Sequence, residues 1–207
     1  MTTSVMLAFL ATSAILAVTP GPDNLFVMSQ AAMHGRKSGI VVTLGLCTGL
    51  IVHSIAVALG IAVIFQTSAT AFTALKIFGG VYLLYLAWKA FKSSEHRMKD
   101  EMKPSATTKT LYIRGIVMNI TNPKVSIFFL AFLPQFTDPS RGSVSLQVLA
   151  LGALFIVATF IIFGTISTLS GLLHEIFKKS ERAQKFINRI AGFVFVGLAA
   201  KLVTAKQ

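Results

Sequence analysis

The chain has 207 residues, of which 54% are hydrophobic and only 13% are charged, and its formal net charge is +12. A soluble domain carries about a quarter charged residues, so this composition excludes an ordinary soluble domain. Apolar runs of the roughly 20 residues needed to cross a bilayer can be placed near 4–28, 39–65, 69–91, 111–134, 145–173 and 186–204. We therefore expect an all-α membrane protein with six transmembrane helices.

The first and fourth apolar runs are interrupted by proline. The interruptions read Thr19-Pro20-Gly21-Pro22-Asp23-Asn24 and Asn119-Ile120-Thr121-Asn122-Pro123-Lys124. Proline has no backbone N–H, and its ring clashes with the carbonyl one turn earlier, so we expect helices 1 and 4 to be broken here. In lipid, freed backbone groups are tolerated only inside protein or along a watery cavity. Paired breaks in corresponding segments therefore indicate the substrate site of a transporter.

Each break carries one charge. Asp23 is the only acidic residue placed well inside a run, and Lys124 is the cation of the other break. An ionised group at that depth is costly, so it normally faces the bundle interior beside a partner. The two residues could pair or neighbour each other, with Asp23 as a proton or substrate-ammonium site and Lys124 as its counter-ion or a carboxylate partner. The alternative is that both are structural charges that cap broken helices near an interface.

The breaks also offer neutral groups to a ligand. Half-helix N-termini expose N–H groups that suit a carboxylate, and freed carbonyls suit an ammonium, so two breaks together fit a zwitterionic amino acid. The side chains of Asn24, Asn119, Thr121 and Asn122 could bind the ligand or only cap the backbone. The candidate substrate-binding residues are Pro20, Gly21, Pro22, Asp23, Asn24, Asn119, Thr121, Asn122, Pro123 and Lys124.

The second run adds a histidine and a helix-packing pattern. His53 lies deep in this run, where it could relay protons together with Asp23 or act as a neutral packing residue. Gly45 and Gly49 form a GxxxG pattern, which lets helices approach closely, either within one subunit or between two copies of a homodimer. Cys47 is the single cysteine, which excludes an internal disulfide, and we interpret it as a small packing residue.

The two halves of the chain match weakly. Pro20 corresponds to Pro123, Leu44-Gly45 to Leu151-Gly152, and Gly80 to Gly192. Three spans in each half require the second half to enter the membrane from the opposite side, so we expect two inverted three-helix repeats. Residues 1–207 would form one transmembrane domain: repeat one at about 1–92, a polar cytoplasmic linker at about 93–110, and repeat two at about 111–207.

The positive charge is distributed by loop. The first, third and fifth connections hold 14 of the 19 basic residues. By the positive-inside rule these loops are cytoplasmic and both termini face outward. Nucleic-acid binding would need the charge on one folded basic surface, so we exclude that partner. No protease, hydrolase or nucleotide-binding motif and no cluster of metal ligands is visible, so we expect a transporter that is not an enzyme and holds no cofactor or metal.

The chain resembles the LysE/RhtB family of bacterial amino-acid exporters over essentially its whole length. The matching segments lie at 19–24, 34–39, 44–53, 79–89 and 122–136, the last reading Asn-Pro-Lys-Val-Ser-Ile-Phe-Phe-Leu-Ala-Phe-Leu-Pro-Gln-Phe. The resemblance implies efflux of amino acids or their derivatives across the bacterial inner membrane, driven by proton antiport. It also implies that Pro20, Gly21, Pro22, Asn122 and Pro123 belong to the substrate site.

The substrate and two rival functions stay open. The spans hold no acidic pair for a basic side chain, which favours neutral substrates. One rival is a membrane thiol electron carrier of related fold, which would need two cysteines at the middle of the membrane. The other is a non-transporting scaffold or a passive channel.

Overall fold

The computed structural model describes all residues except 20, 62–67, 93–105, 171–180 and 205–207. The described residues form helices and connecting loops with no strand, which confirms the all-α prediction. In the first half the helices are α1 (Thr3–Val18), α2 (Pro22–His34), α3 (Arg36–Ala56), the π-helical turn η1 (Val57–Ile61) and α5 (Ala69–Lys92). In the second half they are α6 (Thr108–Ile120), α7 (Pro123–Ile127), the π-helical η2 (Phe128–Phe132), the 3₁₀ turns η3 (Leu133–Phe136) and η4 (Pro139–Arg141), α8 (Val144–Thr168) and α10 (Glu181–Thr204).

Both predicted breaks are present. The chain bends by 61° between α1 and α2, and by 48° between α6 and the segment Pro123–Phe136. Pro22 and Pro123 are the first residues of the helices that follow, where a missing N–H costs nothing because the first turn has no partner for it. Pro20 lies outside the described residues.

Two helices are long and apolar enough to cross a membrane alone, namely Arg36–Leu59, which joins α3 to the start of η1, and Val144–Thr168. The two bent pairs meet the same test when each is taken as one span. Together they account for four of the six predicted spans among the described residues. The remaining two predicted spans correspond to α5 and α10, and the linker predicted at about 93–110 falls mostly outside the described residues.

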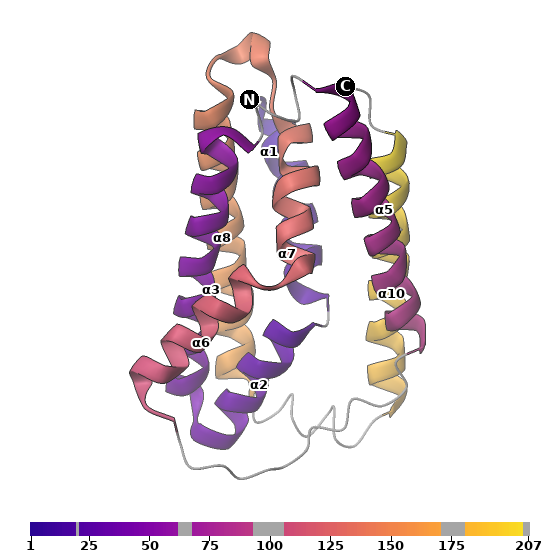
Figure 1. Ribbon diagram of the computed structural model, residues 1–207. Coiled ribbons are helices and arrows are strands. Elements are labelled where there is room, and N and C mark those ends of the chain that lie inside the picture. The colour runs from indigo at the N-terminus through magenta and orange to yellow at the C-terminus, as the bar shows by residue number, and fades with distance from the viewer. Residues whose placement is uncertain (20, 62–67, 93–105, 171–180, 205–207) are drawn as a thin grey trace.

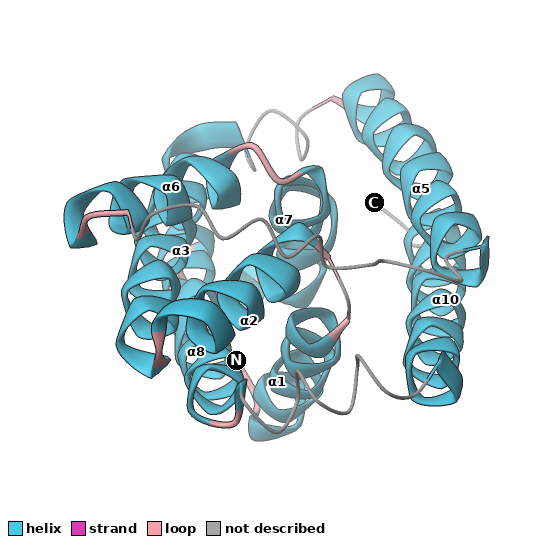
Figure 2. Cartoon of the chain, turned by 90° about the horizontal axis from the view of Figure 1, so that it is seen from below, coloured by secondary structure: helices cyan, strands magenta, loops and turns pink. Residues whose placement is uncertain are grey.

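The helices form two groups. In Figures 1 and 2, α5 and α10 lie side by side, and α1 and α7 lie between this pair and the group of α3, α6 and α8. Phenylalanine rings fill the centre: the ring centroids of Phe9 and Phe136 are 5.2 Å apart, and those of Phe129 and Phe155 are 5.3 Å apart. Lipid tails are as apolar as these rings, so close packing and not exclusion of water stabilises their association.

The GxxxG pattern joins α3 to α6 within one chain. A Cβ on Gly45 would collide with the carbonyl oxygen of Tyr112 and lie 3.0 Å from Gly115 Cα. A Cβ on Gly49 would lie 2.7 Å from Asn119 Cβ. The two backbones therefore touch along one face of α3, and glycine is required because any side chain would push the helices apart.

Small residues also join helices that run in opposite directions. A Cβ on Gly39 would lie 3.0 Å from Ser167 Cβ, and one on Gly152 would lie 2.8 Å from Ser54 Cβ, so α3 and α8 meet twice. Between α5 and α10, Gly80 faces Val203 and Gly192 faces Phe91 in the same manner.

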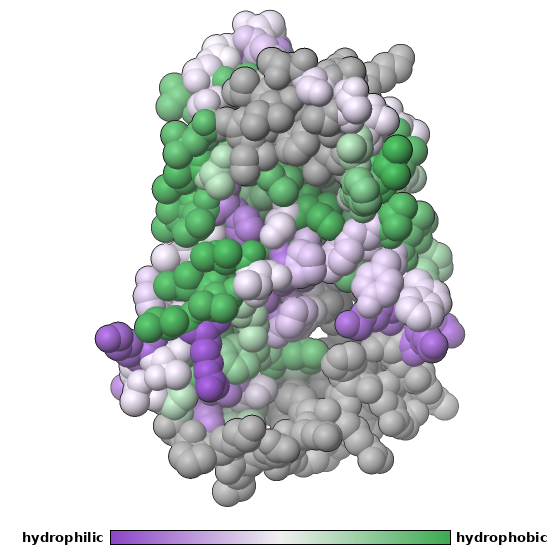
Figure 3. Space-filling view, viewed as in Figure 1, coloured by the Kyte–Doolittle hydropathy of each residue, from purple (hydrophilic) through white to green (hydrophobic). Residues whose placement is uncertain are grey.

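The charges gather where several helices end. Arg36 and Lys37 begin α3, Lys89 and Lys92 end α5, and Lys109 lies in the first turn of α6. These helix ends all lie toward the lower end of Figure 1, and the strongly hydrophilic side chains of Figure 3 lie mainly toward that end. Lys92 Nζ lies 4.8 Å from the centre of the Trp88 ring, an arrangement typical of the edge of a membrane.

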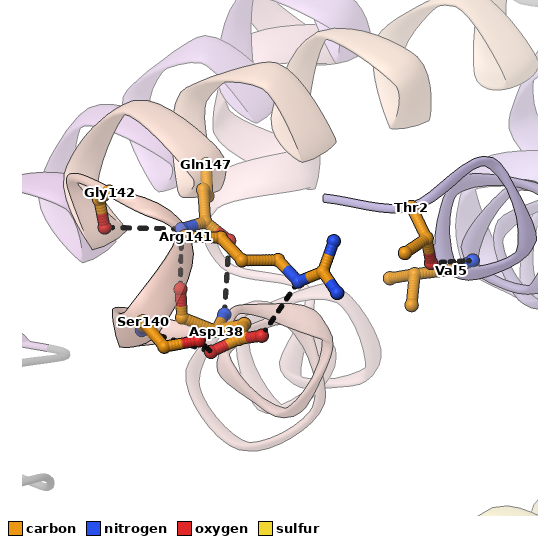
Figure 4. A network of polar contacts seen from close by, with 7 residues as sticks. All are labelled: Thr2, Val5, Asp138, Ser140, Arg141, Gly142 and Gln147. Atoms are coloured by element: carbon orange, nitrogen blue, oxygen red, sulfur yellow. Dashed lines mark hydrogen bonds and ion pairs between the residues drawn. The ribbon is translucent and has the colours of Figure 1, made fainter.

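At the opposite end a polar network orders the connection before α8 (Figure 4). Gln147 donates to the carbonyl oxygens of Asp138 and Gly142 and accepts from Asp138 N–H. Ser140 donates to the Asp138 carboxylate, and Arg141 Nε lies 3.0 Å from its Oδ2. These hydrogen bonds and the nearby guanidinium hold the pKa of Asp138 below its ordinary value.

We predict that Gly115→Ala destabilises the protein by about 1–3 kcal/mol, because overpacking against backbone cannot be relieved by a rotamer change. The new Cβ would meet the Val42 carbonyl and lie 3.0 Å from Gly45 Cα. Gly164→Ala is the matched control, since nothing lies within 4 Å of that position. Thermal unfolding in detergent should show a lower midpoint for Gly115→Ala alone. Equal midpoints for both variants would contradict the contact between α3 and α6.

Candidate functional site

The first break frees four carbonyl groups at the end of α1. A helix leaves its last carbonyls without partners, and here Pro20 and Pro22 have no N–H to offer to Leu16 and Val18. Asn24, in the first turn of α2, turns back so that its Nδ2 lies 2.6 Å from Ala17 O and 3.5 Å from Val18 O. The side chain of Asn24 thus replaces two backbone donors.

The other two carbonyls receive Lys124 from the second break. Its Nζ donates to Thr19 O at 3.1 Å and to Leu16 O at 3.3 Å. A cation at the C-terminal end of a helix is also favoured by the helix dipole. Gly21 leaves room for this contact, because a Cβ there would lie 3.1 Å from Lys124 Nζ. All four carbonyls are therefore satisfied inside the protein, as the bilayer demands.

The second break is organised by Asn122. Its Oδ1 accepts from Lys124 N–H at 3.0 Å and so caps α7, while its own N–H donates to Asn119 O. Its Nδ2 donates to Asp23 Oδ2 at 2.9 Å. The Asn122 side chain thus caps the start of α7 and also binds the Asp23 carboxylate at the start of α2.

Asp23 and Lys124 are neighbours that do not bond to each other. Each charge instead bonds across to the opposite break: Asp23 to Asn122, and Lys124 to the end of α1. Asp23, Asn122 and Lys124 expose only 2%, 3% and 6% of their surface. The site is thus buried, and two reciprocal links hold the breaks together.

Three buried oxygen atoms at the breaks have no hydrogen-bond partner. They are Asp23 Oδ1, Asn24 Oδ1 and Asn119 Oδ1. Buried polar atoms are normally paired, so unpaired acceptors in this place call for a donor from a ligand or water. All three are acceptors, so the groups that they call for are N–H or O–H donors.

His53 reaches the second break from α3. Its Nε2 lies 3.3 Å from Asn119 O, and its ring centroid lies 5.5 Å from that of Phe129. Thr121, by contrast, is exposed, and its hydroxyl donates to Val117 O of its own helix. The structure therefore brings His53 to the predicted site residues and leaves the Thr121 side chain outside them.

Sequence reasoning missed the groups that complete the site. The backbone carbonyls of Leu16, Ala17 and Thr19 are the partners of the two breaks, and only the positions of the prolines could have indicated which carbonyls are freed. Gly49, treated as a packing residue, presses on the side chain of Asn119. No group of three or more metal-ligating side chains occurs in the part of the chain that the structure describes.

Comparison with known proteins identifies the family. The model of the LysE type translocator family matches residues 14–206. The chain belongs to this family. LysE type translocators are membrane transporters and not enzymes. The relatives of this chain include efflux proteins for homoserine and for leucine, so the family is one of amino-acid efflux transporters.

The relatives match almost end to end. A homoserine/homoserine lactone efflux protein of Salmonella typhi is 30% identical over 97% of this chain and 96% of its own. A leucine efflux protein of an Enterobacter species is 28% identical over 91% of this chain and 90% of its own. The uncharacterized membrane protein YrhP of Bacillus subtilis is 28% identical over 95% and 97%. No solved structure matches the chain.

We predict that Asn122→Ala lowers stability more than loss of an ordinary helix cap. The cap itself is worth about 1 kcal/mol, and Asp23 Oδ2 would be left buried and unpaired, which adds about 1–3 kcal/mol. Thr107→Ala, which removes the cap of α6 at an exposed position, is the control. If both variants unfold at the same temperature in detergent, the bond between Asn122 and Asp23 does not hold the breaks together.

Proposed function

We propose that this LysE type translocator is a secondary active exporter that moves neutral amino acids or close derivatives out of the cytoplasm in exchange for protons. The observation that carries the proposal is the pair of buried breaks joined by Asn122 to Asp23 and by Lys124 to the end of α1. Charged groups and freed backbone inside a membrane bundle are typical of substrate and proton sites. The proposed substrate site comprises both breaks, including Pro20, Gly21, Pro22 and Pro123 of the sequence prediction.

The relatives indicate which part of the substrate is recognised. Homoserine, homoserine lactone and leucine appear in their names. All three compounds carry an α-ammonium group, whereas the lactone has no carboxylate. The unpaired oxygens of Asp23, Asn24 and Asn119 suit an ammonium. Asp23 is the one acid at the breaks, so no second acid is present for a basic side chain, and neutral amino acids fit best.

Export would proceed by alternating access between two inverted repeats of three spans each, with α5 and α10 as the third and sixth spans. The reciprocal contacts support this symmetry: Gly39 and Gly152 are separated by the same 113 positions as Ser54 and Ser167. Gly80 and Gly192 are likewise separated by the same 112 positions as Phe91 and Val203. Contacts of the type i to j and j to i are the mark of a two-fold axis. In Figure 1 the corresponding helices of the two halves run in opposite directions.

The charge distribution supports an orientation in the bacterial inner membrane. The basic helix ends would face the cytoplasm, and the start of α1 and the end of α10, which both lie toward the other end of Figure 1, would face outward. Protons and membrane lipid are then the other partners. Because the GxxxG glycines of α3 already pack against α6 of the same chain, a homodimer would have to use a different surface.

The rival functions lack comparable support. A thiol electron carrier needs two cysteines, and Cys47 is the only one in the chain. A passive channel or scaffold remains the alternative, and a transport assay separates it from an exporter.

The proposal predicts accumulation of homoserine or leucine in everted vesicles or proteoliposomes whose lumen is acidified. Asp23→Asn should reduce the accumulation at least about tenfold, since a hydrogen bond to a charged group is worth about 1.5–3 kcal/mol. Asp138→Asn, an acid-to-amide change at an exposed position, should leave it unchanged. Accumulation that is absent for the wild type, or insensitive to the pH gradient, would favour the passive alternative.

We also predict that His53→Ala changes how transport depends on pH. If His53 relays protons to the second break, the midpoint of the pH profile should move while the maximal rate falls only a few-fold. His34→Ala, at the end of α2 away from the breaks, is the control. A profile identical to the wild type would leave His53 as a packing residue and remove it from the proton path.

A further inference from the structure

The ammonium group of Lys124 occupies a position in which the ammonium group of a ligand would also find hydrogen-bond acceptors. Its Nζ donates hydrogen bonds to Thr19 O and Leu16 O. These two carbonyl groups have no backbone N–H partner because the helix ends at the break. These atoms belong to α1, whereas Lys124 belongs to α7, so the contact depends on how the two halves approach each other. A lysine ammonium and the α-ammonium of an amino acid each present three N–H donors and one positive charge. The two groups therefore compete for the same acceptors.

The surrounding atoms favour an ammonium over other ligands. Asp23 Oδ1 and Asn24 Oδ1, both unpaired, belong to the same break as these carbonyls, and Asn24 Oδ1 lies 3.9 Å from the Cβ position of Gly21. That Cβ position is itself 3.1 Å from Lys124 Nζ. A cation that replaced the lysine ammonium would meet the same two carbonyls, with the Asp23 charge and the unpaired Asn24 oxygen in the same break. Two cations would repel each other strongly in such a buried place.

We propose that the substrate's α-ammonium displaces the ammonium of Lys124 from Leu16 O and Thr19 O, so that a proton on Lys124 and a substrate occupy the site in turn. The inference rests on the proposed exporter function and names the group that couples the two flows. Lys124 is then the coupling residue, and Asp23 is the fixed negative charge that either cation neutralises.

The exchange balances with one proton for each substrate. On the cytoplasmic side, Lys124 Nζ releases a proton to water, becomes a neutral amine and leaves the two carbonyls, and the substrate's ammonium takes them. After the protein opens to the other side, the substrate departs, Nζ takes up a proton from water, and the ammonium returns to the carbonyls. A state with neither cation would leave Leu16 O and Thr19 O unpaired as well as the Asp23 and Asn24 oxygens that already lack partners, which is costly, so the protein changes sides only when one of the two cations is bound.

Few other groups can take over this proton. Asp23 from α2 is the charged neighbour of Lys124, and His53 from α3 reaches the same break through Asn119 O. The sequences of α1 and α8, which pack around the breaks, contain no titratable side chain. Lys109 lies in the first turn of α6 and Arg114 at its middle, and both are exposed, whereas the break is buried.

Two substitutions of Lys124 should both abolish accumulation but differ in whether exchange persists. In Lys124→Met the carbonyls are free for the substrate, so exchange of labelled for unlabelled homoserine or leucine across proteoliposomes should persist within about threefold, while accumulation driven by the pH gradient should vanish. In Lys124→Arg the guanidinium stays protonated at every working pH, so it blocks the carbonyls and both activities should vanish. A residue with a merely structural role would tolerate Arg better than Met.

Proton release gives an independent measurement. Adding homoserine or leucine to the purified wild type in weakly buffered detergent should release about one proton per bound substrate, and Lys124→Met should release none while still binding. Lys109→Met and Lys109→Arg, at an exposed position in the first turn of α6, should match the wild type in every assay. If Lys124→Met does not insert, Lys124→Gln replaces it.

The outcomes separate the two proposals. Accumulation at the wild-type level in Lys124→Arg, or substrate binding by the wild type without proton release, overturns the role of Lys124 and leaves the exporter function standing. A wild type that accumulates neither homoserine nor leucine under a pH gradient counts against the exporter function itself.

Discussion

Four carbonyl groups at the end of α1 impose the constraint that the rest of the structure meets. Prolines remove the donors that would have continued the helix, and lipid offers no replacement. Asn24 and Lys124 supply the missing hydrogen bonds, and Lys124 can do so only if α7 lies against α1. The bond from Asn122 to Asp23 fixes the same contact in the other direction. A broken helix, ordinarily a weakness, here becomes the element that holds the two halves together.

The glycine contacts of α3 extend this arrangement to a third helix. Because Gly45 and Gly115 bring two backbones into contact, the end of α6 is held firmly beside α3. Asn119 is thereby pressed against Gly49, and His53 comes within reach of the Asn119 carbonyl. The packing motif and the polar site are therefore one structure: a side chain at Gly45 would move the second break as well as loosen the bundle.

Much of the fold could be predicted from the sequence because its signals are local. Apolar runs and prolines indicated helices and breaks, and isolated charges such as Asp23 and Lys124 indicated the site. The partners could not be predicted, because they are backbone carbonyls and side chains from the opposite half. Pro22 and Pro123 are each the first residue of a half-helix, so the predicted match of Pro20 with Pro123 has an alternative in which Pro22 is the counterpart of Pro123, and Asp23 that of Lys124. Thr121 looked equivalent to its neighbours, and only the helix geometry shows that it faces outward.

The contact between α3 and α8 has a consequence for motion. Ser54 and Ser167 each donate to a carbonyl of their own helix, Leu50 O and Phe163 O, so neither hydroxyl proton bonds across to the other helix. Each serine rests in the hollow left by a glycine, once toward either end of the pair. Because packing joins the helices at these two serines, a small tilt of α8 against α3 would break neither of the two serine hydrogen bonds.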